Sequence, residues 1–408
     1  MFIRGPFCLF VNSVLHSPTV SLSVGSAGLL ERARGLSSLI DRCRDEIETS
    51  RQIPSELIEA ITEAGLFRLW LPRKFGGYET DPVTFLQVVE EISAMDGATG
   101  WIVAISSLGG FFAGCLSEEV VHEIYGPNPD VLVAGGINPT GKAVPVEAGY
   151  RVTGRWSFGS GIRHASWVYG NAVIHEQDKP RLAPDGSPEM RLMLFPVTQC
   201  TILDTWHVGG LRGTGSHDFS VDDIFVPNER TLVPFVGEAV QPGILYRYPF
   251  SLFPAVIAAV PLGIARGSID TLMELADIKK PGGYIGSLRE RPSAQMAIAR
   301  AEGLVRSARA FFVESMQQLG EAIIRDGEAS LKQRAMLRIA CCQAALNCTQ
   351  AVDLMYNTGG ASSIYTSSRL ERAFRDIHAA VQHIAVTPAY FELAGRVLVG
   401  LPPGTTRF

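Results

Sequence analysis

The sequence predicts an α+β protein of three parts: an N-terminal helical domain, a central β-barrel or sandwich, and a C-terminal helical bundle. Three patterns predict it. Apolar residues recur at helical spacing in 29–130, short runs rich in β-branched and aromatic residues fill 131–237, and heptad-like spacing returns in 238–408. A chain of 408 residues is long enough for two or three domains.

The first 28 residues predict no domain. Residues 1–24 are apolar and rich in serine, and Arg4 is their only charge. Pro6, Asn12 and Pro18 interrupt the continuous apolar run that a secretory signal needs. We therefore expect 1–28 to be a poorly ordered extension.

The N-terminal domain, 29–130, should consist of packed helices. Apolar side chains from Phe85 to Ile92 fall on one helical face, and Pro54 is typical of a helix start. The uncharged stretch 97–116 is long enough to cross a membrane but holds five glycines. We expect it to be a helix buried within the protein, begun by Asp96 as the N-cap, and we expect no membrane association.

The central domain, 131–237, should be all β. Its strands are expected at 150–158, 167–174, 191–197 and 219–226, separated by glycine, proline or aspartate turns.

The last domain, 238–408, should be a four-helix bundle. Its longest apolar seam steps by four and three residues through Ala297, Ala301, Leu304, Ala308 and Phe311. Further helices are expected at 249–266, around 335–346 and at 373–398.

Composition excludes several functions. Net charge is −5 without a basic block, so no nucleic-acid partner is expected. The seven cysteines are irregularly spaced and form no CxxC pair, which favours reduced thiols in a cytoplasmic protein over disulfides or zinc. No metal is expected: His378 and His383 are five residues apart and do not share a helical face.

Three local motifs could carry chemistry. In GRWSFGSG, 154–161, the Ser160 hydroxyl could donate to a flat ring or could only close a β-turn. GLRGTGSHDFSVDDIFVP, 210–227, lacks phosphate-loop spacing and is better interpreted as a strand-connecting turn, with Arg212 and His217 as possible pocket-edge groups. His383 could act on a ligand or could be a core histidine.

A longer segment resembles a known family. The stretch from Gly359 to Val386, GGASSIYTSSRLERAFRDIHAAVQHIAV, resembles the last flavin-contacting segment of the acyl-CoA dehydrogenase fold, including its Gly-Gly turn and the pair Arg375–Asp376. The order of elements matches that fold over roughly 50–400. The resemblance implies the following site residues: for the flavin, Asn138, Phe158, Ser160, Gly161, Gly359 and Gly360, and for the substrate, Trp101, Ser106 and Arg212.

One substitution moves the expected activity away from dehydrogenation. Where many dehydrogenases of this fold carry a catalytic glutamate, the chain has Gln382, His383 and Ile384. It resembles instead the flavin-dependent monooxygenases of the same fold, some of which carry a substrate-binding histidine where this chain has 105–108, Ile-Ser-Ser-Leu. The resemblance implies His383 and Ser160 as catalytic residues.

The implied reaction hydroxylates an aromatic or heteroaromatic substrate with molecular oxygen through a C4a-hydroperoxyflavin. Reduced FMN or FAD would come from a separate flavin reductase, and the protein would be a homotetramer. Two other hypotheses stay open: an acyl-CoA dehydrogenase whose base is Glu371 or Asp376, and a non-catalytic scaffold of this fold.

Overall fold

The computed structural model describes residues 24–233, 239–283, 285–405 and 408. Of the predicted extension 1–28, residues 1–23 lie outside this part, and 24–28 belong to the first helix. Likewise, the predicted boundary between 237 and 238 lies outside the described residues. The helices before the first strand are α1 (Val24–Gly35), α2 (Ser37–Ser50), α3 (Ser55–Glu63), α4 (Pro82–Met95), α5 (Gly97–Ala113) and α6 (Glu118–Tyr125).

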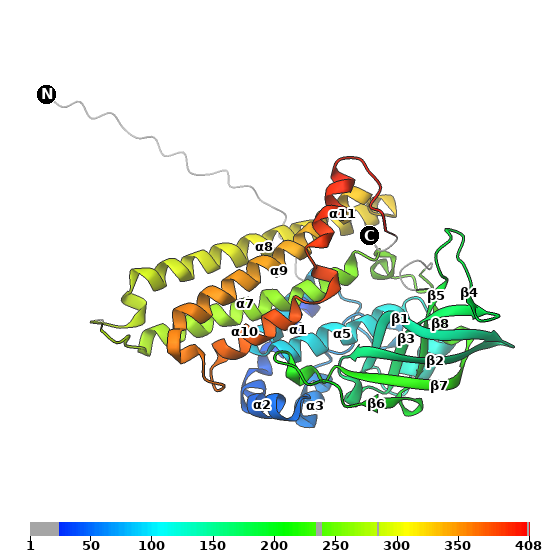
Figure 1. Ribbon diagram of the computed structural model, residues 1–408, viewed down its shortest axis with the longest axis horizontal. Helices are drawn as coiled ribbons and strands as arrows, with labels where there is room; N and C mark the ends of the chain where they lie inside the picture. The colour runs from blue at the N-terminus through cyan, green and yellow to red at the C-terminus, as the bar shows by residue number, and fades with distance from the viewer. Residues whose placement is uncertain (1–23, 234–238, 284, 406–407) are drawn as a thin grey trace.

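Helix α5 connects the parts of the molecule. It lies centrally, between the bundle and the sheet, and packs on both α7 and β1 (Figure 1). Asp96 is its N-cap, because the carboxylate accepts the backbone N–H of Thr99 at 2.8 Å, as the sequence predicted. Every residue of α5 is buried, which confirms a helix inside the protein.

The central domain is one hydrogen-bonded sheet of eight strands within the described residues, in the order β6-β7-β2-β1-β3-β5-β8, with β4 paired to β3. The sequence correctly placed the four strands β2 (Gly149–Gly159), β3 (Trp167–Glu176), β5 (Met190–Pro196) and β7 (His217–Pro227). The short strands β4 (Lys179–Pro180), β6 (Thr201–Leu203) and β8 (Thr231–Leu232) complete its edges.

The longest strand, β1 (Val133–Val146), was not predicted. Its glycines and prolines are typical of turns. In the sheet they allow a register shift between Gly136 and Gly141. A side chain at Gly136 would collide with Trp156, because a Cβ there would lie 2.7 Å from the Trp156 Cβ. Glycine is therefore needed for packing rather than for a turn.

The C-terminal domain is the predicted bundle. It is built from α7 (Leu252–Ile278), α8 (Pro292–Asp326), α9 (Leu331–Gly359) and α10 (Arg369–Ala380), with α9 packed against the other three (Figure 1). By length and composition α7 could cross a membrane, but 89% of its most apolar window is buried inside the protein. It is the core helix of the bundle.

The helix predicted at 373–398 is wrong in one respect. The chain leaves α10 after Ala380 and begins α11 (Ala389–Leu398) only after Pro388. Proline keeps the preceding residue out of helical conformation, and Thr387 is accordingly extended, with ψ 143°. His383 therefore lies on the connection, as the N-cap of a short 3-10 turn, and not on a helix.

A buried polar joint holds the three domains together. Asp376 of α10 accepts the backbone N–H of Leu211, from the β domain, at 2.6 Å. Arg372 of α10 lies 3.6 Å from Asp96 at the start of α5 and 3.7 Å from Glu48 of α2. Burial, reinforced by the charges of Asp96 and Glu48, raises the pKa of Asp376 to about 7, against the lowering effects of the Leu211 amide and Arg372.

This pKa predicts a pH-dependent stability. Between its ordinary pKa of 3.8 and about 7, Asp376 keeps a proton in the folded state that the unfolded chain has released. The wild type should therefore lose stability as pH rises through this window. Asp376→Asn should lack this loss, so its unfolding free energy relative to wild type should rise by ~1 kcal/mol per pH unit in urea titrations. A gap that does not change with pH would contradict the assignment.

Candidate active site

The end of β2 and the turn that follows it present two residues predicted to contact flavin, Phe158 and Gly161. Phe158 has a φ of 67°, in the left-handed region, and its side chain is 61% exposed. Gly161 has a φ of 72°, and a Cβ there would lie 3.1 Å from Ile102 of α5. The turn thus approaches α5 closely and leaves a flat aromatic ring uncovered beside it.

Ser160, between these two residues, is buried, and its hydroxyl contacts two neighbouring polar groups. Its Oγ accepts the indole N–H of Trp101 at 3.1 Å and lies 2.7 Å from the Oγ of Ser216. Ser216 is in turn 2.7 Å from the hydroxyl of Thr214. Sequence reasoning missed Ser216 and Thr214, although the hydroxyls of the segment GLRGTGS were the available signal.

Trp101 also brings His383 to the same place. The two ring centroids are 5.9 Å apart, and the Phe253 ring of α7 lies 5.6 Å from His383 on another side. The structure therefore brings together Ser160, Trp101 and His383, three of the predicted residues. Phe253 gave no sequence signal, because its environment in the helix is uniformly apolar.

The protonation of His383 follows from its contacts. Its Nδ1 accepts the backbone N–H of Ala385 at 3.1 Å, so the proton of the neutral ring is on Nε2. Burial and, as the smaller cause, the positive charge of Arg338 together lower the pKa of His383 to about 4. Arg338 is itself buried and donates to the Ala385 carbonyl at 3.1 Å. In the sequence, Arg338 could have been noticed as a charged residue on the same helical face of α9 as the apolar Ala335.

The other predicted residues lie apart from this group. Arg212 donates to the backbone carbonyls of Glu48 and Val208, both at 3.1 Å, and so belongs to the domain joint. Ser106 donates to the Val103 carbonyl and is about 140° around α5 from Trp101. Asn138 is exposed on β1, within the segment where the register shifts.

Gly359 and Gly360 lie at the opposite end of α9 from the His383 environment. Arg338 marks the near end, and 21 residues of helix separate it from Gly359, a distance of roughly 30 Å. Lys279, at the end of α7, donates to the Gly359 carbonyl there. Within one chain these glycines cannot contact a ring bound beside Ser160.

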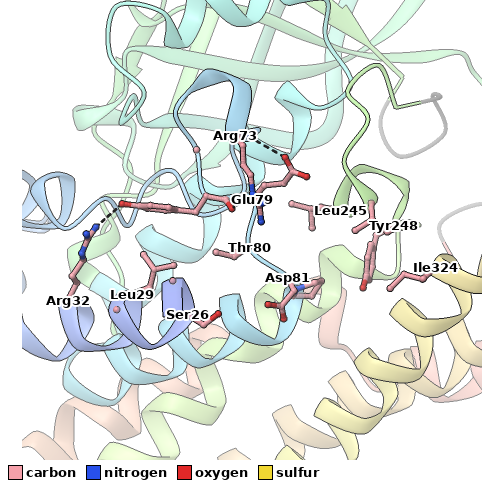
Figure 2. Close-up of a pocket in the computed structure, with 16 residues that line it drawn as sticks. Ser26, Leu29, Arg32, Arg73, Glu79, Thr80, Asp81, Leu245, Tyr248 and Ile324 are labelled. Carbon is pink, nitrogen blue, oxygen red and sulfur yellow. Dashed lines mark hydrogen bonds between the residues drawn. The ribbon is translucent and has the colours of Figure 1, made fainter. Parts of the chain in front are cut away.

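A cavity of about 860 Å³ lies elsewhere, between α1, the 77–82 loop, the 244–248 segment and the end of α8 (Figure 2). Arg32, which lines it, donates to the Tyr78 hydroxyl at 2.7 Å. None of Ser160, Trp101 and His383 lines it.

Comparison with known proteins identifies the chain's relatives. Residues 36–119 match the family "Acyl-CoA dehydrogenase, N-terminal domain", and residues 255–388 match "Acyl-CoA dehydrogenase, C-terminal domain". The indole-3-acetate monooxygenase of Pseudomonas putida is 32% identical over 94% of this chain and 98% of its own. HsaA of Rhodococcus jostii, the oxygenase subunit of a flavin-dependent monooxygenase, is 29% identical over 91% and 98%.

The chain belongs to the flavin-dependent monooxygenases of the acyl-CoA dehydrogenase fold. A solved relative, XiaF from Streptomyces in complex with FADH2 and glycerol, has a TM-score of 0.85 at 26% identity and covers 93% of this chain and 97% of its own. The predicted fold, the enzyme class and the use of a reduced flavin are thereby confirmed.

The site fits this family better than it fits an acyl-CoA dehydrogenase. Both carboxylates proposed as a displaced base are held by partners outside the group of Ser160, Trp101 and His383. Glu371 is held by Arg375 at 2.6 Å, and Asp376 is 2% exposed and bound to Leu211. In contrast, Phe158 offers a flat exposed ring and Ser160, two residues further on, a buried polar atom, groups suited to an isoalloxazine.

The state of His383 can be tested by NMR. We expect ¹⁵N signals of a neutral imidazole protonated on Nε2 throughout the neutral range, with titration only near pH 4, because burial disfavours the cation. The variant His383→Asn assigns the resonance. A midpoint near the ordinary value of about 6.5 would contradict the structure.

Proposed function

We propose that this monooxygenase is the oxygenase component of a two-component system that hydroxylates a small aromatic or heteroaromatic compound. A separate reductase would supply reduced FMN or FAD by diffusion. The observation that carries the proposal is the convergence of Ser160, Trp101 and His383 from three different parts of the chain. The description of HsaA as an oxygenase subunit supports a separate reductase.

When bound, reduced flavin supplies the two electrons that let one atom of O2 enter the substrate while the other leaves as water. The chain's own residues then have distinct tasks. Phe158 would lie against the flavin ring and Ser160 would hold its polar edge, while Trp101 and Phe253 would exclude water from the reacting atoms. Aromatic walls favour an aromatic substrate, and indole-3-acetate in the name of one relative agrees with that class.

The geometry favours one of the two roles expected for His383. With Nδ1 engaged by the Ala385 N–H and the proton on Nε2, the ring can donate a hydrogen bond but has no open nitrogen to accept a proton. Its lowered pKa also makes it a weak base. We therefore propose that His383 donates through Nε2 to the oxygen being transferred.

The function is tested by oxygen labelling. The protein, a flavin reductase, NADH and a panel of aromatic acids and phenols are incubated under ¹⁸O2. One labelled oxygen per product supports the proposal. Reduction of tightly bound flavin by an acyl-CoA, with no labelled product, would support a dehydrogenase instead.

We predict that His383→Ala lowers product formation about 10²-fold, the usual effect of removing a positioned proton-bearing group. Flavin consumption should continue, with released hydrogen peroxide replacing product. The matched control is His378→Ala: His378 is bound to Asp353 at 2.9 Å and lies on α10, before the connection that carries His383. Equal activity in both variants, per folded molecule, would make His383 structural.

We also propose a homotetramer. Large apolar side chains are exposed at the end of the bundle remote from the sheet: Ile278 is 78% exposed, Ile285 99% and Tyr365 64%. Apolar surface of this kind is typical of subunit contacts. A second copy could also bring its Gly359 and Gly360 to the flavin of the first.

Light scattering at micromolar concentration should return the mass of four 44.2 kDa chains. Replacing Ile278 and Ile285 by aspartate should yield smaller species, because each charge would have to be buried at the contact. A monomeric wild type would refute the assembly.

A further inference from the structure

Three buried hydroxyls form a continuous chain from the β-domain loop to the flavin-facing turn. Thr214, Ser216 and Ser160 are 1%, 3% and 7% exposed, and successive oxygens are 2.7 Å apart. At one end Thr214 Oγ1 lies 2.9 Å from the Leu211 carbonyl, and at the other Ser160 Oγ meets the indole N–H of Trp101.

The two ends fix the direction of every proton in the chain. A carbonyl oxygen can only accept, so Thr214 must donate to Leu211. Thr214 then has no proton left for Ser216, so Ser216 donates to Thr214. By the same reasoning Ser160 donates to Ser216. Since the Trp101 indole can only donate, it occupies one of the two lone pairs of Ser160.

Ser160 is thereby left as an acceptor. Its proton is committed to Ser216, and one lone pair has no donor among the residues that the structure describes. This differs from the expectation that Ser160 would donate to the flavin. The sequence could not show whether Ser160 donates or accepts this hydrogen bond. The answer depends on the Leu211 carbonyl, and no motif indicates where that carbonyl lies.

The Leu211 carbonyl is itself rigidly held. Leu211 has a φ of 51°, uncommon for a residue other than glycine, and its N–H is bound to the buried Asp376. Its carbonyl also accepts the indole N–H of Trp206 at 3.1 Å. The pair Arg375–Asp376, noted in the sequence but without a part in the reaction, thus anchors the far end of the hydroxyl chain.

We propose that Thr214 and Ser216 are positioning residues that hold Ser160 as a hydrogen-bond acceptor and so make the site select reduced over oxidised flavin. Reduced isoalloxazine carries a proton on N5 and can donate it in a hydrogen bond, whereas oxidised N5 has only a lone pair. An acceptor at Ser160 matches the first and repels the second. This inference rests on the proposed function and specifies how the reduced cofactor is recognised.

The test compares variants that differ in one hydroxyl. Thr214→Val removes it at nearly constant volume, and Thr214→Ser retains it. Ser216→Ala breaks the chain at its middle. Ser106→Ala is the matched control, because this buried hydroxyl donates only to its own helix. Dissociation constants for reduced FMN and FAD are measured anaerobically, and those for the oxidised forms in air, on the same preparations.

The readout is the ratio of oxidised to reduced dissociation constants, from which any loss of folded protein cancels. Wild type, Thr214→Ser and Ser106→Ala should share a high ratio. Thr214→Val and Ser216→Ala should lower it by about 5-fold or more, the scale of one hydrogen bond, because Ser160 is freed to turn its proton toward the ring.

Two results would overturn this inference but leave the proposed function standing. One is an unchanged ratio of dissociation constants in both Thr214→Val and Ser216→Ala. The other is a fall of the ratio in Thr214→Ser as large as that in Thr214→Val. The first would mean that the chain does not set the sense of Ser160, and the second that packing rather than the hydroxyl matters. Failure of wild type to bind any reduced flavin would overturn the proposed function, and this inference with it.

Discussion

The contact between the Asp376 carboxyl and the Leu211 amide joins the two halves of the site. On one side, α10 continues from Asp376 into the connection that carries His383. On the other, Leu211 begins the loop whose hydroxyls end at Ser160. Asp96, which caps α5 and so places Trp101, lies within the same buried joint. One short hydrogen bond at the meeting point of three domains therefore fixes the relative position of the groups of the candidate site.

Such a joint is costly to bury, which explains its composition. Arg372, 6% exposed, lies between Asp96 and Glu48 at salt-bridge distance, so the acidic groups are not left without an opposite charge. The raised pKa of Asp376 shows that compensation is incomplete. A buried network of this kind contributes specificity of arrangement more than stability, and the site needs a fixed arrangement because a hydrogen-bonded chain fails if one oxygen moves.

Elements with a strong local signal were predictable from sequence. The Asp96 cap, the buried α5 and four strands follow from capping chemistry and periodicity. Strand β1 could not be predicted in this way, because its glycines are required by contact with the Trp156 ring, which is a tertiary contact. In the site, Ser160, Trp101 and His383 could be predicted through the family resemblance. The roles of Thr214 and Ser216, and the tautomer of His383, depend on hydrogen-bond partners that only the folded chain brings together.

The central claim is that a reduced flavin ring binds between the Ser160 turn and His383. A crystal structure of the protein soaked anaerobically with reduced flavin tests it most directly. The account predicts a ring against Phe158, with N5 within hydrogen-bond distance of the Ser160 oxygen and with His383 Nε2 facing the same ring. A flavin bound away from Ser160, for example in the cavity near Arg32, would contradict it.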